Sequence, residues 1–582
     1  MELSLSSRLA AIRALSVAIV GMTSGASSAD TTPAAFDFQD VTVGDRQTVH
    51  SNTVKVAGID EPTSIALSGT ASGRFQVNGG AWQSGSATVD AGDEIRLRLV
   101  SRAMGDPGAR RVTLDIGGVA GEWRVTTTAA DIPPPANKVF DLGGTTPGAP
   151  CGGKVRCVSA GQSIQAAIDA ANGGDTIQVA AGTYDANLRI EGKTIRLLGG
   201  FPAAGGFASR NPLSNPTILR STGGDATVTL EAARSSVVDG FRIRNGTGSA
   251  VYGGEGGGVF VHGGNVRVSN NIVADNVVCG PPEGECRGGG IYVLDGGNVV
   301  IAGNIVRDNR AARGAGIATN GIGPADTTIT IRDNLVEGNR ATSDHGGGLY
   351  VFGNLRILRN IVRANSVGLD VGYGWGGGIL VVEAGGVAHL EHNRVTDNLA
   401  PSLGSGVFVD EGATANLNGD LIYDNACGVT GSGVYVDGSY DGRGSVVNLN
   451  NVTVADHDCE GNGHGLYAEG ASKVVVTNGI FHRNGGTDAT YCADPGTQGC
   501  EGSQPTKLSI RYTLIDDFPG MGNFSANPRF VDRNGGNYRL APGSPAIDTA
   551  DPASSVAYEP APNGGRRDLG SYGGTRKATP SP

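Results

Sequence analysis

The sequence predicts an all-β protein whose largest part is a parallel β-helix, and three observations support this. A motif of about 30 residues recurs along the chain, and in each copy a glycine triplet, an aliphatic strand and paired asparagines keep the same order. Each copy holds three short stretches of alternating apolar and polar residues, which is typical of one solenoid coil. Glycine supplies 96 of the 582 residues, about twice its usual share, as recurrent tight turns require.

Residues 1–29 have the pattern of a secretory signal peptide. Arg8 and Arg13 provide a positive flank, a short apolar run follows, and small residues precede Asp30. We therefore expect a mature protein that is secreted or otherwise extracytoplasmic, at the cell surface or in the periplasm. After this signal no segment approaches the ~20 apolar residues of a spanning helix, so no membrane span is expected.

Two segments separate the signal from the repeats. Residues 30–130 contain short alternating runs such as EIRLRLV and RVTLDIGG, which indicate half-buried strands and thus a small β-sandwich accessory domain. A proline-rich linker over residues 131–150 follows it. The simplest interpretation of the sandwich is a spacer or docking domain without chemistry of its own.

An amphipathic helix and a strand open the next region. Apolar residues recur at helical spacing between an N-cap at Ser163 and a stop at Gly173, and the strand TIQVAAGTY follows. We expect this helix to cap the open end of the solenoid. Together with LLGGFPAAGG and NPTIL, this start resembles that of right-handed parallel β-helix (pectate-lyase-like) proteins, including polysaccharide lyases and pectin esterases. The resemblance implies a right-handed β-helix over residues 151–525.

The C-terminal region carries a second resemblance. The stretch NPRFVDRNGGNYRLAPGSPAIDTADPA, from Asn527 to Ala553, and the later GGRRDLGSYGG resemble the end of choice-of-anchor Q β-helix proteins. This implies a C-terminal cap and tail over residues 526–582. The choice-of-anchor Q module is found on exported bacterial proteins, and it does not fix an activity.

Two sets of asparagines mark the register of the coils. Because equivalent residues of neighbouring coils lie ~4.8 Å apart, we expect each set to form a ladder whose amides bond to the coils above and below. One set recurs once per coil, with His457 taking its place once, and the other stands five residues earlier. The first set is Asn245, Asn276, Asn309, Asn339, Asn365, Asn398, Asn425 and Asn484, and the second is Asn271, Asn304, Asn334, Asn360 and Asn393.

The eight cysteines agree with this register. Cys427 follows Asn425 by two residues as Cys459 follows His457, so the two should lie at one position on successive coils, within disulfide reach. The other six form close local pairs, which are Cys151 with Cys157, Cys279 with Cys286, and Cys492 with Cys500. Eight cysteines that all pair indicate an oxidising compartment.

The strand after each glycine triplet carries an outward-facing stripe. Its aliphatic residues face the core, so the residue between them faces out. Exposed rings could stack on sugars and form a polysaccharide groove; alternatively, the neighbouring loops fold over the stripe and bury it. The stripe consists of Phe260, Tyr292, Ala318, Tyr350, Leu380, Phe408, Tyr435 and Tyr467, and its six aromatic members are the candidate substrate-binding residues.

Acidic residues gather just beyond the ends of the same strands. Asp410, Asp437 and Glu469 hold equivalent positions on three successive coils, and Glu383 and Glu411 lie beside them. Like carboxylates ~5 Å apart repel, which raises a pKa or invites a cation, and oxygen ligands suit Ca²⁺. We therefore take Glu383, Asp410, Asp437 and Glu469 as a candidate Ca²⁺ site. The alternative is a row of solvated strand-end acids.

Basic residues near these acids form no recognisable catalytic motif. The β-helix polysaccharide lyases hold Ca²⁺ against a uronate and use a lysine or arginine as base, and Lys473 and Arg443 are only neighbours in sequence. His345 and His464 lie next to or within glycine triplets, so we expect both to decorate loops. No catalytic residue is assigned.

Charge and motifs leave three functions open. A formal net charge of −11 argues against a nucleic-acid partner, which would select a basic face. The first function is an exported monomer that binds polysaccharide or a cell-surface glycan, or acts in a matrix, without catalysis. The second is a Ca²⁺-assisted lyase of an acidic polysaccharide, and the third is a structural or adhesive rod.

Overall fold

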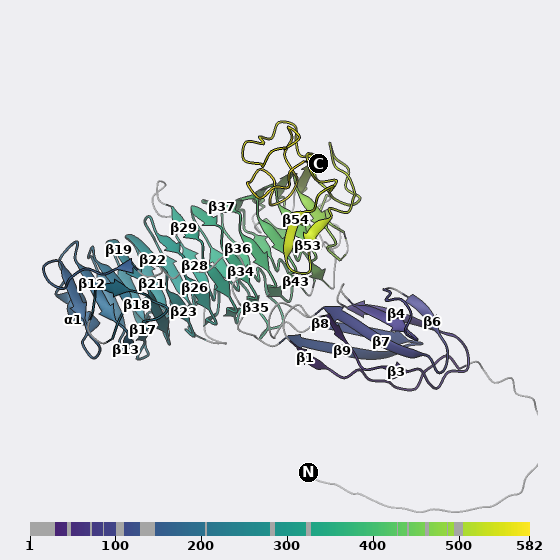
Figure 1. Ribbon diagram of the computed structural model, residues 1–582, viewed down its shortest axis with the longest axis horizontal. Coiled ribbons are helices and arrows are strands. Elements are labelled where there is room, and N and C mark those ends of the chain that lie inside the picture. The colour runs from purple at the N-terminus through teal and green to yellow at the C-terminus, as the bar shows by residue number, and fades with distance from the viewer. Residues whose placement is uncertain are drawn as a thin grey trace, which may run out of the picture.

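The computed structural model contains a β-sandwich, a long β-solenoid and a C-terminal tail that lies against the side of the solenoid (Figure 1). The predicted signal peptide and most of the predicted linker lie outside the described residues. The structure describes residues 30–43, 48–69, 73–84, 86–100, 110–127, 146–203, 206–279, 286–321, 328–427, 429–438, 442–459, 465–485, 487–493 and 505–581.

The N-terminal sandwich packs two sheets around one apolar core. One sheet has the order β1-β9-β8-β4-β6, and in the other β7 pairs with β2, β3 and β5. Alternation along β8 buries Val112, Leu114 and Ile116 in the core that the sheets share. Arg110, at the start of β8, forms an ion pair with Asp424 of the solenoid. The strands are β1 (Val41–Val43), β2 (Thr48–His50), β3 (Val54–Lys55), β4 (Thr63–Gly69), β5 (Arg74–Val77), β6 (Ser86–Val89), β7 (Glu94–Val100), β8 (Arg110–Ile116) and β9 (Val119–Thr127).

Helix α1 (Ile164–Asp169) lies at the start of the solenoid. Ser163 caps it, because the Ser163 Oγ accepts a backbone N–H of the first turn at 3.1 Å. Its buried residues Ile164 and Ile168 belong to the solenoid core. The helix ends before the predicted stop at Gly173. Within the described part of the chain, no helix is long and apolar enough to cross a membrane.

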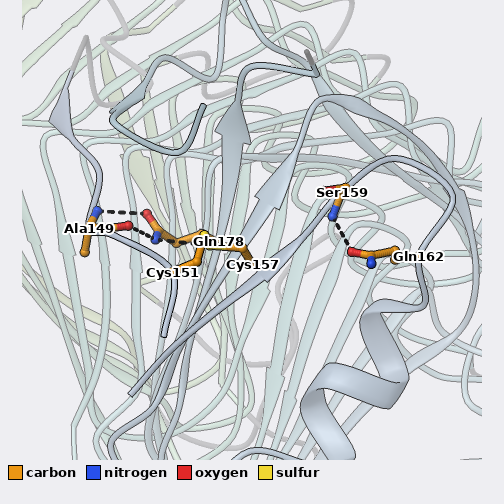
Figure 2. Close-up of a disulfide and its surroundings, with 6 residues drawn as sticks. All are labelled: Ala149, Cys151, Cys157, Ser159, Gln162 and Gln178. Carbon is orange, nitrogen blue, oxygen red and sulfur yellow. Dashed lines mark hydrogen bonds between the residues drawn. A yellow bond between two sulfur atoms is a disulfide. The ribbon is translucent and has the colours of Figure 1, made fainter. Parts of the chain in front are cut away.

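The predicted disulfide between Cys151 and Cys157 is present beside this helix, with the two Cα atoms 5.6 Å apart (Figure 2). Cys157 lies on the first strand of the solenoid, opposite Gln178 of the second. The Gln178 amide donates to the Ala149 carbonyl at 2.6 Å and accepts the Ala149 N–H at 3.1 Å. The segment before the solenoid is thereby tied to its first coil.

Three parallel sheets form the walls of the solenoid, and each coil adds one strand to each sheet. Sheet I has 13 strands: β11 (Val155–Val158), β12 (Thr176–Ala180), β15 (Arg196–Phe201), β19 (Arg234–Asp239), β22 (Asn265–Ser269), β25 (Val300–Ala302), β29 (Ile329–Arg332), β33 (Leu355–Leu358), β37 (Val387–Glu391), β41 (Thr414–Asn418), β45 (Val446–Asn450), β49 (Lys473–Thr477) and β52 (Lys507–Arg511).

Sheet II has 11 strands: β13 (Gly182–Asp185), β17 (Thr217–Arg220), β20 (Phe241–Arg244), β23 (Ile272–Ala274), β26 (Ile305–Arg307), β30 (Leu335–Glu337), β34 (Ile361–Arg363), β38 (Arg394–Thr396), β42 (Leu421–Tyr423), β46 (Thr453–Ala455) and β50 (Ile480–His482). Sheet III also has 11: β14 (Leu188–Glu191), β18 (Val228–Glu231), β21 (Val259–His262), β24 (Ile291–Leu294), β28 (Ile317–Asn320), β32 (Leu349–Val351), β36 (Ile379–Val381), β40 (Val407–Val409), β44 (Val434–Val436), β48 (Leu466–Ala468) and β51 (Ala489–Tyr491).

Short strands also form between sheets II and III. The six-stranded corner sheet comprises β27 (Arg310–Ala311), β31 (Arg340–Ala341), β35 (Ser366–Val367), β39 (Leu399–Ala400), β43 (Ala426–Cys427) and β47 (Asp458–Cys459). Elsewhere, β10 (Thr146–Pro147) pairs with β16 (Ser209–Arg210), and η1 (Ala250–Tyr252) is a 3-10 turn. Inward-facing residues of sheets I, II and III form one continuous core along the rod, as the period-two pattern predicts.

Both asparagine ladders form in the core-facing turns, and their amides are buried. In the first, the Asn276 amide donates to the Asn309 Oδ1 at 2.8 Å, and the pattern continues to Asn425, whose backbone N–H donates to the His457 Nδ1 at 3.1 Å. The second runs from Asn271 to Asn393 and ends on Asp420. Each amide also donates to a carbonyl of the coil before, which satisfies turn groups that water cannot reach.

The register is wrong at one position, Asn245. The strand register pairs Arg242 with Ile272 and Ile243 with Val273, so Asn245 is equivalent to Asp275. The ladder residue of that coil is Gly246, whose N–H donates to the Asn276 Oδ1 at 2.9 Å. Asn245 is exposed with φ of 62°, a left-handed conformation that asparagine tolerates.

The other cysteines follow the predicted pattern as far as they are described. Cys279 and Cys286 form a disulfide. Cys427 and Cys459 are register partners on β43 and β47, and Cys427 is disulfide-bonded. Cys492 is also disulfide-bonded, whereas Cys500 lies outside the described residues.

The tail folds back over the outer face of the last strands of sheet II. Its hairpin, β53 (Phe530–Asp532) and β54 (Asn537–Leu540), places Tyr538 against Tyr423, with ring centroids 4.6 Å apart. Asp456 fixes the hairpin, because its carboxylate accepts hydrogen bonds from Arg533 at 2.7 Å and from the Tyr538 hydroxyl at 2.8 Å. The tail therefore packs along the side of the rod as well as near its end.

Candidate functional site

The aromatic stripe forms in the predicted register on the outer face of sheet III. Its members pair across neighbouring strands from Phe260 to Tyr467. Neighbouring rings touch, with centroids 5.9 Å apart for Phe260 and Tyr292 and 5.2 Å apart for Tyr435 and Tyr467.

The stripe is nevertheless covered, so an open stacking groove at these six residues is not what the structure holds. Phe260 and Tyr292 are 0% exposed, Phe408 and Tyr435 2%, and Tyr350 6%. Tyr467 is half-buried. Of the two alternatives for the stripe, the covered one is observed.

The glycine triplets explain the cover. The first glycine of a triplet is left-handed, as at Gly288 with φ of 70°. A Cβ there would lie 2.6 Å from the Cβ of Tyr292, because the chain turns back directly above the ring. The third glycine is tight for another reason: a Cβ at Gly290 would lie 2.6 Å from the Gly316 carbonyl oxygen of the next coil.

A second column of side chains covers the stripe, and we call it the pre-glycine column. Its members stand immediately before the glycine triplets and contact their equivalents on neighbouring coils. Two of its members, Trp375 and Leu403, pack on the stripe, and so does Tyr252, which stands outside the column. The column consists of Glu255, Arg287, Arg313, His345, Trp375, Leu403 and Thr430.

Charged groups of this column are paired in the middle of the rod. The Arg287 guanidinium lies 4.0 Å from the Glu255 carboxylate and 5.7 Å from the Tyr350 ring centroid. Asp344, next to the column, lies 3.1 Å from Arg313 and 2.6 Å from the His345 Nδ1. Burial alone would raise the pKa of Asp344, but the hydrogen bond and charge of His345, with Arg313, hold that pKa well below its usual range.

A row of three rings, His345, Trp375 and Tyr373, leads from the same region to the surface. The ring centroids of His345 and Trp375 lie 4.7 Å apart, and those of Tyr373 and Trp375 lie 6.3 Å apart. Tyr373 is 50% exposed. His345 was expected only to decorate a loop, and it instead joins a ring pair to an ion pair. His464 lies outside the described residues.

Three acids, Glu383, Asp410 and Glu411, form what we call the acid patch. Glu383 and Glu411 are exposed and left-handed, with φ of 65° and 55°, a conformation that costs a residue other than glycine on the order of 1 kcal/mol. The Asp410 Oδ1 accepts the backbone N–H of Glu411 at 2.7 Å. Burial, assisted by the charge of Glu411, raises the pKa of Asp410 to about 6. Burial and the Glu411 charge also raise the pKa of Glu383.

Arg443 lies beside the acid patch. A Cβ at Gly412 would be 3.3 Å from the Arg443 Cβ, and Gly412 directly follows Glu411. Lys473 instead begins β49 on sheet I, where it is exposed. Of the two basic residues singled out in the sequence, only Arg443 is near the acids.

Asp437 and Glu469 are equivalent to Asp410, since each follows a register-paired strand. Their environments differ from that of Asp410. Glu469 is buried and accepts a hydrogen bond from the Tyr435 hydroxyl, and burial followed by the Glu469 charge raises the pKa of Tyr435 far above its usual range. The Asp437 Oδ1 accepts the Gly438 N–H at 2.6 Å.

The residues of the candidate Ca²⁺ site do not fit such an ion together. Among the described residues, no three histidine, cysteine, aspartate or glutamate side chains converge on one point that could hold a metal. Asp410, Asp437 and Glu469 instead accept the hydrogen bonds given above, and of the four candidate ligands only Glu383 and Asp410 belong to the acid patch.

One polar cluster near the N-terminal end of sheet III was missed in the sequence. The Tyr252 hydroxyl donates to the Glu231 Oε1 at 2.8 Å and lies 2.8 Å from the His262 Nδ1, while Arg189 pairs with Glu231. The Tyr252 hydrogen bond, with Arg189, lowers the pKa of Glu231. Glu231 and His262 are register partners at the strand end that Asp410 occupies farther along, so extending that column backwards would have found them.

Comparison with known proteins supports the fold. Residues 247–398 and 285–441 match the family model described as a right handed beta helix region. No curated protein sequence matches the chain. Among solved structures, the Family 28 exopolygalacturonase of Yersinia enterocolitica is 10% identical and aligns over 80% of this chain and 97% of its own, with a TM-score of 0.20. The family match and the three-sheet solenoid identify the fold as a right-handed parallel β-helix.

Proposed function

We propose that this protein is an exported glycan-binding protein that uses the middle of the sheet III face. The observation that carries the proposal is that the exposed Tyr373 ring and the half-buried Trp375 ring lie on the same or neighbouring coils as the exposed carboxylates of Glu383 and Glu411. His345 lies beside the rings, because its own ring contacts Trp375.

The residues of this region suit a sugar chain. Aromatic faces such as those of Tyr373 and Trp375 stack on the apolar face of a pyranose ring. Carboxylates accept hydrogen bonds from sugar hydroxyls, and ionised acceptors form the stronger hydrogen bonds. Successive coils repeat every ~4.8 Å, so an extended chain can contact several coils at once.

The charge of the acid patch favours a neutral glycan. Arg287 and Arg313 are each close to an acid of their own, Glu255 and Asp344, and Arg443 beside the patch brings one positive charge against three carboxyl groups, so the patch keeps a negative balance. A uronate polymer would be repelled unless a cation intervened. We therefore propose a hydroxyl-rich, uncharged polysaccharide as the ligand class.

Export rests on the signal-like residues 1–29 and the disulfides. Cys151–Cys157 and Cys279–Cys286 are local cross-links, and such bonds persist outside the reducing cytosol. A cell-surface position suits the likeness of the tail to choice-of-anchor Q proteins, and the sandwich would serve as a spacer. We propose that the protein acts as a monomer.

Affinity electrophoresis of the purified protein in gels containing β-glucan, xylan or polygalacturonate tests this function. We expect retardation by a neutral glycan and about tenfold weaker binding in Trp375→Ala, which removes the stacking ring. Trp82→Ala is the matched control, because Trp82 is a similarly half-buried tryptophan of the sandwich. Equal retardation of both variants, or none by any neutral glycan, would refute glycan binding at this face and leave the structural rod as the better interpretation.

A second candidate is glycoside hydrolysis, with Asp410 as the proton donor. A carboxyl whose pKa is about 6 is still largely protonated in mildly acidic solution and can protonate a leaving sugar oxygen there, while an ionised Glu383 or Glu411 acts as base. Release of reducing ends would then fall as pH rises through ~6 and drop by at least ~100-fold in Asp410→Asn. Release that Asp410→Asn leaves unchanged would exclude this role.

The Ca²⁺-assisted lyase has less support. No described group of acids fits the ion, and Arg443 is the only basic residue singled out in the sequence that lies near the patch. Incubation with polygalacturonate and Ca²⁺ should give no rise in the ultraviolet absorbance of an unsaturated product. A calcium-dependent rise would show that lyase cleavage, and not glycoside hydrolysis, is the better second candidate.

A further inference from the structure

A pocket of about 460 Å³ lies between the C-terminal tail and the corner that joins sheets I and II. Its solenoid wall comes from the turns before β34, β38 and β42, and its other wall is the tail segment Ser571–Lys577. This volume is in the range of small-molecule sites. The corner between sheets I and II is a different part of the coil from the sheet III face.

The lining of this pocket is cationic, although the whole chain carries a formal net charge of −11. Arg359, His392, Arg394, Arg576 and Lys577 line it, and no aspartate or glutamate is among the described lining residues. Clefts lined by one sign of charge concentrate ligands of the opposite sign.

The tail supplies the cations that have no acidic partner. Within the described ranges, the side chains of Arg576 and Lys577 take part in no ion pair, and both are exposed. Arg359, on the solenoid side, is already held by two 2.9 Å hydrogen bonds to Asp333 outside the pocket. Ligand charge would therefore be balanced mainly from the tail.

The pocket is held in shape before any ligand arrives. The Ser571 N–H donates to the Thr453 Oγ1 at 3.0 Å, and the Arg539 Nε donates to the Lys577 carbonyl at 3.0 Å. The Thr575 hydroxyl bridges the turn by donating to the Tyr572 carbonyl at 2.6 Å. A preformed wall reduces the entropy that binding must overcome.

Two features shape the floor. Gly419 is left-handed with φ of 69°, and a Cβ there would lie 2.4 Å from the His392 Nδ1, so only glycine leaves room for the His392 ring. Ile361, Leu421 and Tyr572 add apolar surface. The pocket thus combines a cationic rim with an apolar wall.

We propose that this pocket binds an anionic ligand of monosaccharide size. The guanidinium and ammonium groups of Arg576, Lys577 and Arg394 bind its phosphate or carboxylate, because charge-assisted hydrogen bonds to oxyanions are the strong ones. The ring of the ligand lies against Leu421 and Tyr572. This site is independent of the proposed glycan face, and either can fail alone.

Isothermal titration of the full chain with four probes tests the proposal: inorganic phosphate, glucose 6-phosphate, galacturonate and glucose. At least one of the two sugar anions should bind more tightly than phosphate, glucose should not bind, and the preferred sugar anion identifies the charged group. The double variant Arg576→Ala/Lys577→Ala should weaken binding by at least about tenfold.

Lys473→Ala/Lys507→Ala is the charge-matched control, because these exposed lysines are register partners on sheet I. It should bind like the wild type. Absence of binding by both sugar anions, phosphate binding as tightly as they do, or equal losses in the two double variants would each overturn the proposal. Gly419→Ala adds a test of the floor, since the displaced His392 should weaken the same ligand while thermal unfolding reports on folding.

Discussion

The carboxylate of Asp420 ends a ladder of asparagines by accepting two hydrogen bonds from Asn393, one from its backbone N–H and one from its amide, both at 2.8 Å. Its other oxygen accepts the backbone N–H of Asn418 at 3.0 Å. Burial raises the pKa of Asp420 to about 7, although these hydrogen bonds favour the ionised form. An acid thus takes the place that asparagine holds in the coils before.

Asp420→Asn should remove a pH dependence of stability. The unfolded pKa is ~3.9, so between ~4 and ~7 the folded chain binds more protons and the free energy of unfolding falls as pH rises. The variant loses this pH dependence. In the wild type, the total change in the free energy of unfolding over this pH range is at most ~4 kcal/mol, at ~1.4 kcal/mol per pKa unit. At pH 5 it should be the less stable protein, because its amide cannot accept the Asn418 N–H. Urea unfolding at pH 5 and 8 measures both effects, and parallel pH profiles would contradict the prediction.

Asp344→Asn should act in the opposite direction. The folded pKa of Asp344 is depressed by His345 and Arg313, so its contribution to stability is present above ~4 and is lost as pH falls through the folded pKa. The variant should lower the free energy of unfolding at pH 7 by about 1–3 kcal/mol. Thermal unfolding should show a difference in melting temperature between wild type and variant that is smaller at pH 3 than at pH 7. An equal difference at both pH values would argue against the ion pair.

Asn334→Ala should be among the more damaging single changes in the rod. The Asn334 amide donates to the Ile301 carbonyl at 2.9 Å and to the Asn360 Oδ1 at 3.0 Å, and each buried group left without a partner costs about 1–3 kcal/mol. Asn448→Ala is the control, because its 2.9 Å bond to Asn416 is on an exposed ladder of sheet I. In denaturant unfolding, Asn334→Ala should lose at least ~2 kcal/mol more of the free energy of unfolding than Asn448→Ala. Similar midpoints would show that burial does not determine the loss of stability.

Gly288→Ala separates conformational strain from collision. Both Gly288 and Gly372 are left-handed, with φ of 70° and 78°, so alanine costs each roughly 1–2 kcal/mol. Only at Gly288 would the new Cβ meet a neighbour, the Tyr292 Cβ at 2.6 Å. We expect a clearly larger drop in melting temperature for Gly288→Ala than for Gly372→Ala, and equal drops would mean that the backbone above Tyr292 can move aside.

Peptide mapping under non-reducing conditions should recover a peptide that links Cys427 to Cys459. The two are register partners and Cys427 is disulfide-bonded. Recovery of Cys427 linked to any other cysteine would contradict the pairing, and reduction with alkylation provides the control digest.

Most of the fold could be predicted from the sequence, because the buried asparagines and the inward-facing aliphatic residues recur once per coil in the same order. Asn276 and Asn309 could be aligned without coordinates, and so could Tyr292 with Tyr435. The slip at Asn245 arose because asparagine suits both the ladder and the left-handed turn beside it. A local sequence pattern therefore predicts the spacing of the coils along the chain more reliably than it predicts which of two adjacent residues points inward.

The candidate site was less predictable, because its chemistry depends on what covers each residue. Asp410 and Glu469 occupy equivalent positions, yet Asp410 belongs to the acid patch and Glu469 is hydrogen-bonded to Tyr435 beneath the surface. The cover of the stripe follows from left-handed glycines above the rings, which the sequence alone did not reveal. The pocket under the tail joins residues ~200 positions apart, and no local pattern records such a meeting.

The tail has a consequence for the order in which this chain can mature. It packs on Leu421, Tyr423 and Ala455, which belong to coils synthesised well before it. Coils can stack one after another as they form, but the apolar side chains on the outer face of these coils stay exposed to water until the final segment docks. A chain that ended just before the hairpin would therefore form nearly the whole solenoid and still expose an apolar surface that favours association with other chains. Only a full-length chain can cover this surface.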